Sequence, residues 1–201
     1  MKKTEWNYWF YLPFLFALSA GALVLILVEK GDDVLFVNSF HAPFFDQLFY
    51  YGTTLGNGWL FIAVAVALAI KNFRYAVIAF SCFTATALLV QFLKKIVFAE
   101  MMRPAVVLAG EPLHFVAGVK LAEQFSFPSG HTALAFSLFC LLSQIVRIRW
   151  LGLLFVLMAL MGGLSRIYLV QHFFMDVYFG ALLGVTVTSA VWWWFSKKYQ
   201  F

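Results

Sequence analysis

Charged residues are scarce in this chain of 201 residues, because aspartate, glutamate, lysine and arginine together make up only 11% of it. A soluble domain of ordinary composition carries about twice that share of charge. The scarcity excludes an ordinary soluble globular domain. The net charge of +5 comes from basic residues scattered in pairs rather than gathered into one patch, so we expect no nucleic-acid partner.

Cysteine and acidic residues are also few, with two cysteines and nine acids. Cys82 and Cys140 lie far apart and show no metal-ligand spacing, so we expect buried free thiols. The acids form no cluster that would hold a metal ion, and we expect neither metal nor cofactor. Repeats, low-complexity tracts and linkers are missing as well, which predicts one domain over residues 1–201 and no obligate protein partner.

Hydrophobic residues, by contrast, make up 64% of the chain, in recurrent runs of near-membrane length. A helix of about 20 apolar residues crosses the hydrocarbon core of a bilayer. The sequence therefore predicts an all-α integral membrane protein. We expect six transmembrane helices: Tyr8 to Val28, Thr53 to Ile70, Arg74 to Val97, Ser129 to Val146, Leu151 to Ile167 and Met175 to Phe195. The segment from Pro43 to Tyr51 is too short to span and is expected to form a helix in the interface.

The loop charges predict the orientation of this six-span topology, because short cytoplasmic loops are enriched in lysine and arginine. Basic residues gather on one side, at Lys2, Lys3, Lys71, Arg74, Arg147, Arg149, Lys197 and Lys198. The opposite side holds every acidic residue except Glu5. We therefore expect both termini in the cytoplasm of a multi-pass protein of the cell (inner) membrane. The first apolar run continues past any cleavage site, which favours an uncleaved span over a signal peptide.

Three polar clusters interrupt the apolar sequence, and they carry most of the functional information. They are Arg103-Pro104, the tetrapeptide Pro128-Ser129-Gly130-His131, and Ser165-Arg166 followed by His172 and Asp176. In the six-span topology the clusters lie at or beside the ends of the third and fifth spans and the starts of the fourth and sixth. All of these ends lie on the outer face. We therefore expect the clusters to converge there.

The tetrapeptide has the features of an anion-binding helix start. Serine is a favoured N-cap residue, and the free N–H groups and positive dipole end of a helix attract an anion. Gly130 would let a phosphate approach the backbone, and His131 would lie beside it. A helix start that is merely well capped explains the turn as well, but it leaves the histidine unexplained.

His172 and Asp176 are four residues apart, a spacing that places two side chains on one helix face. A carboxylate that holds one imidazole nitrogen fixes the tautomer and leaves the other nitrogen as a nucleophile. An ordinary polar helix start is the alternative for this pair alone. Arg103 and Arg166 favour the chemical reading, since guanidinium groups bind phosphoryl oxygens through paired hydrogen bonds.

These blocks resemble the signature of the type 2 phosphatidic-acid-phosphatase superfamily, integral-membrane lipid phosphate phosphatases related to vanadium haloperoxidases. PSGH is complete, and SRxxxxxHxxxD is matched by Ser165, Arg166, His172 and Asp176. The first block departs from the pattern. Its usual spacing of lysine, six residues and Arg-Pro would place Ile96 in the lysine position, whereas Lys94 and Lys95 lie just before it. We expect Lys95 to take the role, with Lys94 as the alternative, so the motif core runs over residues 94–176.

The resemblance implies a role for each matched residue. His172 would attack phosphorus to form a phosphohistidine, with Asp176 orienting it. His131 would protonate the leaving oxygen and then activate water. The phosphate would be held by Lys95, Arg103, Ser129, Gly130 and Arg166. No metal is implied, because fixed cations would stabilise the charge that develops.

The substrate is expected to be a lipid phosphate or diphosphate of the membrane, bound on the periplasmic or exterior face. Undecaprenyl diphosphate is the first expectation, by analogy with compact members of the family. Phosphatidylglycerol phosphate, phosphatidic acid and lipid A phosphates are alternatives. A non-enzymatic anion or lipid transporter is the rival class, although its site should lie near the bilayer midplane. The long connection from Phe98 to Pro128 is apolar enough to lie on the bilayer, as a lid or as a packing loop.

Overall fold

The computed structural model describes residues 6–199, and within that range every regular element is helical. In chain order the elements are α1 (Tyr8–Leu27), α2 (Asp32–Ser39), α3 (Pro43–Gly52), the 3₁₀ helix η1 (Thr53–Gly56), α4 (Gly58–Lys71), α5 (Phe73–Phe92), the π-helical turn η2 (Leu93–Val97), α6 (Pro104–Val107), α7 (Gly130–Ile145), α8 (Leu151–Tyr168) and α9 (Phe174–Tyr199). The predicted all-α class is thus confirmed for the described residues.

The predicted spans agree with the observed helices to within a few residues, except at the start of the second one. We expected that span to begin at Thr53. Thr53–Gly56 instead forms the separate 3₁₀ helix η1, and α4 begins only at Gly58. The segment from Pro43 is helical as expected, and Asn57, in an extended conformation, separates it from α4.

The helices have the length and composition of a membrane protein. Four of them are long and apolar enough to cross a bilayer: Tyr8–Leu27, Phe73–Val97, Leu151–Tyr168 and Phe174–Lys198. Residues Pro43–Gly56 and Gly58–Lys71 pass the same test together but are bent by 53°, and Gly130–Ile145 is apolar but shorter. Six crossings and cytoplasmic termini therefore stay predictions. Lys2, Lys3 and Glu5, which contribute to the predicted orientation, lie outside the described residues.

Asparagine side chains mark the starts of the helices α1, α4 and α5. Asn7, Asn57 and Asn72 each accept a hydrogen bond from the backbone N–H two residues further on, over 3.0–3.1 Å. Asparagine is among the best N-cap residues because its short side chain satisfies an N–H that the helix leaves free. These positions therefore fix where α1, α4 and α5 begin.

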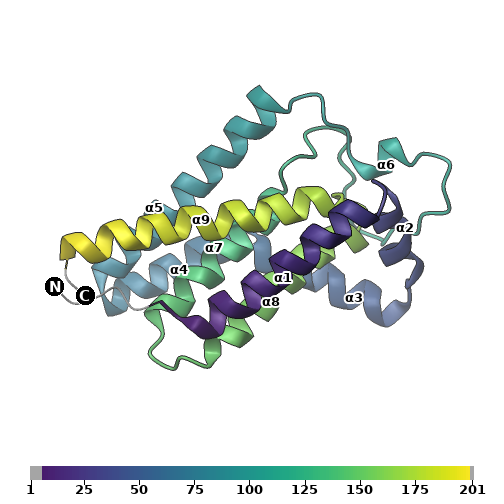
Figure 1. Cartoon of the computed structure of the whole chain (residues 1–201). Coiled ribbons are helices and arrows are strands. Elements are labelled where there is room, and N and C mark those ends of the chain that lie inside the picture. Colours follow the sequence, from purple (N-terminus) through teal and green to yellow (C-terminus); the bar gives the residue numbers. More distant parts are fainter. Residues whose placement is uncertain (1–5, 200–201) are drawn as a thin grey trace.

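Helix α7 lies in the middle of the bundle, packed against α5, α8 and α9 (Figure 1). Small residues let α9 approach it closely. A Cβ atom at Gly180 would lie 2.7 Å from the Ser129 carbonyl oxygen, and one at Gly184 would lie 2.2 Å from that of Ala133. Small residues at four-residue spacing are a common device for close helix packing in membranes. This contact brings the start of α9 to the start of α7, where the Ser129 N–H donates to the carbonyl oxygen of Asp176 over 2.9 Å.

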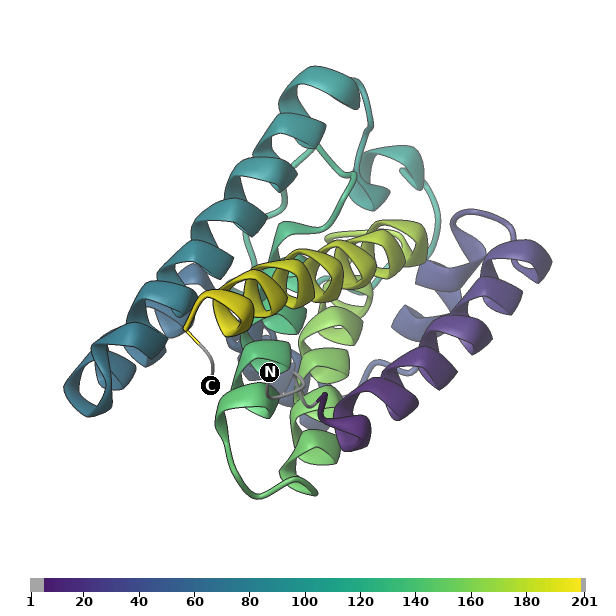
Figure 2. The same ribbon diagram turned by 60° about the vertical axis from the view of Figure 1, so that its left-hand side comes forward.

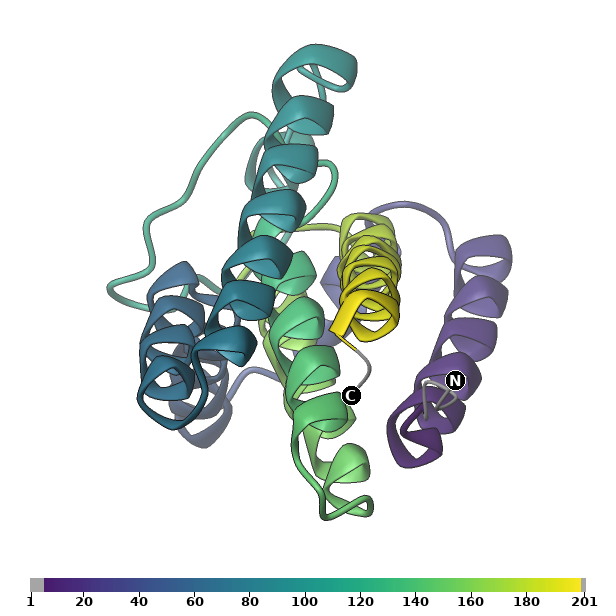
Figure 3. The same ribbon diagram turned by 90° about the vertical axis from the view of Figure 1, so that its left-hand side faces the viewer.

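The short helices and the long connection lie together at one end of the bundle. In Figure 1, α2, α3 and α6 surround the end at which α9 begins, and the connection from residue 98 to residue 129 runs over the same end. Figures 2 and 3 show that the C-terminal end of α5 rises well clear of α9 there. The polar clusters of the sequence lie at this end.

Candidate active site

His172 and Asp176 form a buried hydrogen-bonded pair, each only 1% exposed. The Nδ1 atom of His172 lies 3.2 Å from Oδ2 of Asp176. The pair does not share a helix as the spacing suggested, because α9 begins at Phe174 and His172 belongs to the connection before it. Asp176 reaches back in the manner of a capping box and also accepts the Phe173 N–H over 3.1 Å.

A third donor fixes the same carboxylate oxygen, since the Ser126 hydroxyl donates a short hydrogen bond to Oδ2 of Asp176. Ser126 is buried and lies three residues before Ser129. With three donors around Oδ2, the carboxylate has little freedom to rotate. The Nδ1 proton of His172 is therefore held toward Asp176, which leaves the lone pair on Nε2.

The surroundings keep His172 neutral. Burial lowers the pKa of its imidazole well below the usual range, and the positive charges of Lys94 and Arg166 act in the same direction. A histidine can act as a nucleophile only when it is unprotonated. Burial and the neighbouring positive charges therefore favour the unprotonated form of His172.

Arg166 and Arg103 approach this pair from two different elements. Arg166 lies in the last turn of α8 and is 7% exposed. Its Nη1 donates to Thr53 Oγ1 over 2.6 Å, whereas its buried Nε has no hydrogen-bond partner among the described residues. A buried guanidinium donor without an acceptor is the kind of group that an anion would satisfy.

Gln171 joins the two arginines. Its Oε1 accepts from Nη2 of Arg166 and from Nη1 of Arg103, over 3.3 Å in each case. The Gln171 carbonyl oxygen also accepts from Nη1 of Arg103 over 3.1 Å. Its Nε2 donates to the carbonyl oxygen of Lys120, which ties the long connection to the cluster.

The PSGH turn begins α7 as expected. Ser129 is the N-cap, and its hydroxyl accepts from the Thr132 hydroxyl over 2.9 Å and from the Thr132 N–H over 3.5 Å. A Cβ atom at Gly130 would make only an ordinary contact, 3.5 Å from Val90, so the protein leaves open room at this glycine. The backbone of His131 packs closely against Gly56. A Cβ atom at Gly56 would lie 2.3 Å from the His131 carbonyl oxygen.

Of the two candidate lysines, Lys94 lies in the cluster, and the choice between Lys94 and Lys95 for the phosphate-binding role stays a prediction. Lys94 is 8% exposed and its Nζ donates to the Phe125 carbonyl oxygen over 2.8 Å, whereas Lys95 is exposed. The π-helical turn Leu93–Val97 contains both residues. Such a turn takes up an extra residue per turn, so a spacing taken from regular helices misplaces the side chains within it.

The sequence reasoning missed Thr53, Ser126 and Gln171, which support the predicted residues. Gln171 gave a usable signal, since it is a polar residue directly before His172 in an apolar run. Ser126 offered a weaker one, as a small polar residue just before PSGH. Thr53 gave none, because its contact with Arg166 joins residues 113 positions apart.

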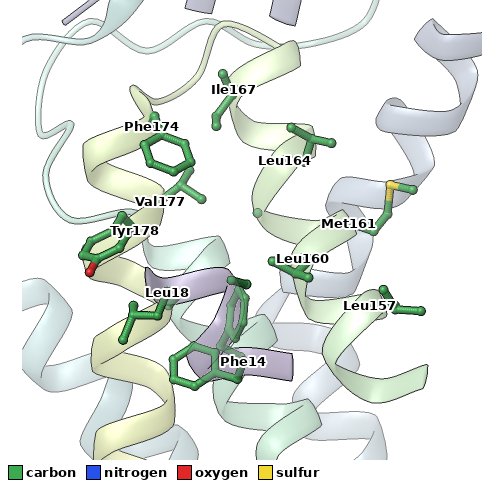
Figure 4. Close-up of a pocket in the computed structure, with 14 residues that line it drawn as sticks. Phe14, Leu18, Leu157, Leu160, Met161, Leu164, Ile167, Phe174, Val177 and Tyr178 are labelled. Carbon is green, nitrogen blue, oxygen red and sulfur yellow. The ribbon is translucent and has the colours of Figure 1, made fainter. Parts of the chain in front are cut away.

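An apolar groove among the described residues lies away from these side chains (Figure 4). It has a volume of about 430 Å³ between α1, α8 and α9, with Phe14, Leu18, Leu164, Phe174 and Val177 among its lining residues. Arg166, His172 and Asp176 do not line it. It is therefore separate from the polar cluster. The described residues also contain no group of three or more His, Cys, Asp and Glu side chains arranged to hold a metal ion.

Comparisons with known proteins agree with this arrangement. The sequence model of the PAP2 superfamily matches residues 74–200, a range that includes all three polar clusters. The chain is similar to the lipid A 4'-phosphatase of Bacteroides thetaiotaomicron, with 29% identity over 162 residues that cover 75% of this chain and 70% of that protein.

Two solved structures share the fold. The crystal structure of LpxE from Aquifex aeolicus superposes with a TM-score of 0.69 and 26% identity, over 79% of this chain and 91% of that one. The transmembrane PAP2-type phosphatidylglycerolphosphate phosphatase of Bacillus subtilis superposes with a TM-score of 0.68 over 96% of this chain and 98% of that one. At 22% identity, the second likeness concerns the fold alone.

Proposed function

Because this chain belongs to the PAP2 superfamily and is a membrane lipid phosphatase, we propose that it works through a phosphohistidine formed on His172. The observation that carries the proposal is the buried pair of His172 and Asp176. The Nδ1 atom of His172 is hydrogen-bonded to Oδ2 of Asp176 over 3.2 Å, which leaves Nε2 of His172 for attack. The unpartnered Nε of Arg166 nearby supports an anionic substrate.

In the first step, Nε2 of His172 attacks phosphorus as the bond between phosphorus and the lipid oxygen breaks. Asp176 holds the Nδ1 proton and stabilises the positive charge that the ring acquires. His131, at the start of α7, donates a proton to the leaving lipid oxygen. The products of this step are the dephosphorylated lipid and a phosphohistidine.

In the second step, His131 acts as the base. It takes a proton from a water molecule, whose oxygen attacks the phosphorus of the phosphohistidine. The phosphorus–nitrogen bond breaks, inorganic phosphate leaves, and His172 returns to its neutral form. His131 thus serves first as acid and then as base, as the reversal of one proton transfer requires.

Fixed positive charges stabilise the phosphoryl oxygens in both steps. We assign this role to Lys94, Arg103 and Arg166, with the free amide of Gly130 at the helix start. Ser129 contributes by capping α7, since its hydroxyl accepts from Thr132. These groups replace the charge stabilisation that a magnesium ion supplies in other phosphoryl transfers, so we propose a metal-independent reaction.

The substrate that we place first is a lipid A phosphate. It is supported by the 29% identity to the lipid A 4'-phosphatase, whose alignment covers 75% of this chain. Undecaprenyl diphosphate, the first expectation from the sequence, stays as a candidate together with phosphatidylglycerol phosphate and phosphatidic acid. We propose that each of these lipids would meet the site at the periplasmic or exterior face.

A phosphate-release panel tests this proposal. The purified full chain is supplied in turn with lipid A, undecaprenyl diphosphate, phosphatidylglycerol phosphate and phosphatidic acid. We expect release from at least one lipid, and none with His172→Ala. His41→Ala is the matched control, because His41 is an exposed histidine outside the cluster. Phosphate release by His172→Ala at the wild-type rate would overturn the mechanism, and no release from any lipid by the wild type would favour the transporter class.

A further inference from the structure

One lysine at the outer end of the bundle is not used by the proposed reaction, although it adjoins the catalytic pair. Lys30 lies in the connection between α1 and α2. Its Nζ lies over the ring of Phe173, 4.5 Å from the ring centroid. Phe173 is 1% exposed and directly follows His172. The ammonium group is therefore turned toward the catalytic connection rather than away from the protein.

Lys30 also borders an open pocket of about 530 Å³. The rest of the lining is residues 96–102, the segment that joins η2 to Arg103. This segment has Lys94 two residues before its start and Arg103 directly after its end. The pocket thus lies between Lys30 and the backbone that carries two of the proposed phosphate-binding cations.

Lys30 has acidic neighbours but forms no ion pair with them. Among the described residues, no carboxylate lies within ion-pair distance of it, although Glu29 and Asp33 line a second pocket with it. Asp33 lies three residues further along the chain. Its two carboxylate oxygens already accept hydrogen bonds from the N–H groups of Gly31 and Phe174.

The pocket has one acidic side chain, Glu100, which is exposed. Lys30 is exposed as well, but its ammonium group lies over the ring of Phe173. The positive group of the pocket is therefore next to the connection that carries His172.

From these contacts we infer that Lys30 and residues 96–102 form a subsite for a second anionic group of the lipid substrate, next to the phosphate that is cleaved. The inference rests on the proposed function and narrows its substrate class. It favours lipids that carry two phosphates over lipids that carry one. The ligand chemistry is a phosphate group held by an ammonium group at the edge of the cluster.

A matched pair of lipids tests the subsite. Undecaprenyl diphosphate, whose two phosphates are adjacent, is compared with undecaprenyl phosphate. We expect Lys30→Gln to lower the ratio of kcat/KM between the diphosphate and the monophosphate by about tenfold, the usual size of one charge-assisted hydrogen bond. Lys30→Arg should keep most of the preference. An unchanged ratio would overturn the inference.

Two control variants separate the subsite from a general disturbance. Glu100→Gln removes a charge from the same pocket and should not lower the ratio. Lys120→Gln removes an exposed lysine of the long connection and should leave the ratio unchanged. A loss of preference in either control equal to that of Lys30→Gln would contradict the assignment.

A binding measurement keeps the inference testable if no lipid is hydrolysed. Inorganic pyrophosphate and inorganic phosphate are titrated into the full chain, and binding is followed by calorimetry. We expect Lys30→Gln to weaken the binding of pyrophosphate about tenfold more than the binding of phosphate. An equal loss of affinity for both anions would overturn the subsite. Pyrophosphate selectivity that depends on Lys30, without lipid turnover, would retain the subsite and reject the proposed function.

Discussion

Arg103 and Arg166 donate to the same side-chain oxygen, Oε1 of Gln171, over 3.3 Å in each case. Two guanidinium groups repel each other, and a shared acceptor holds them at a fixed separation. Arg103 lies in the long connection directly before α6, whereas Arg166 lies in the last turn of α8. Gln171 therefore links the two sides of the proposed phosphate clamp.

Replacing Gln171 should weaken phosphate binding without unfolding the protein. We expect Gln171→Leu to lower kcat/KM by about 10- to 100-fold, because both arginines lose an acceptor and the clamp loosens. The inhibition constant of inorganic phosphate should rise in parallel. Gln171→Glu offers a second test, since a carboxylate would compete with the substrate for the arginines. Normal inhibition by phosphate in both variants would show that Gln171 does not position the clamp.

Lys94 and Lys95 provide a matched pair of neighbouring lysines. Lys94→Ala should lower kcat/KM by about 100-fold, because its buried ammonium group belongs to the cluster. Lys95→Ala should stay within about twofold of the wild type, as exposed charges contribute little. Phosphate release with the same lipid measures both. A larger loss in Lys95→Ala than in Lys94→Ala would return the role to Lys95.

Two glycines should separate stability from activity. Gly56→Ala would place a Cβ atom 2.3 Å from the His131 carbonyl oxygen, so we expect a loss of about 1–3 kcal/mol in the free energy of unfolding. Gly130→Ala meets only Val90 at 3.5 Å and should fold normally. It should nevertheless lose activity, because the methyl group would fill the room proposed for phosphate. Thermal unfolding in detergent and phosphate release distinguish the two; full activity in Gly130→Ala would contradict the placement of the phosphate.

Chelation should leave the reaction unaffected. If Lys94, Arg103 and Arg166 supply the charge stabilisation, turnover of the best lipid should be the same with EDTA and with added magnesium. Initial rates after dialysis against EDTA measure this. A rate that falls on chelation and returns with a divalent cation would reject the metal-independent mechanism.

Much of the fold was predictable, because the lengths of apolar runs and the helix caps are local properties. The starts of α1, α7 and α8 agree with the expected starts to within one residue. The break between η1 and α4 falls on the polar and glycine-rich run from Thr53 to Gly58, which the predicted span placed within one helix. Its reason is tertiary: Gly56 lets the 3₁₀ turn pack against the backbone of His131.

The motif residues of the site were predictable from their chemical types, but their supporting contacts were not. Burying Arg166, His172 and Asp176 costs free energy, so their presence in an apolar chain indicated a function. Thr53 and Ser126 are small polar residues of a kind that occurs throughout such helices, and only the folded chain brings them to Arg166 and Asp176. The choice between Lys94 and Lys95 was not predictable, because both lie in the π-helical turn Leu93–Val97, to which the spacing of regular helices does not apply.

The central claim is that His172 carries the phosphoryl group, and trapping the intermediate tests it most directly. The full chain is mixed with a lipid substrate labelled with ³²P in the scissile phosphate, quenched in alkali within milliseconds to seconds, and mapped by peptide mass spectrometry. The account predicts an alkali-stable, acid-labile phosphohistidine at His172, absent from His172→Ala and longer-lived in His131→Ala. Label on another residue, or wild-type turnover by His172→Ala, would contradict it.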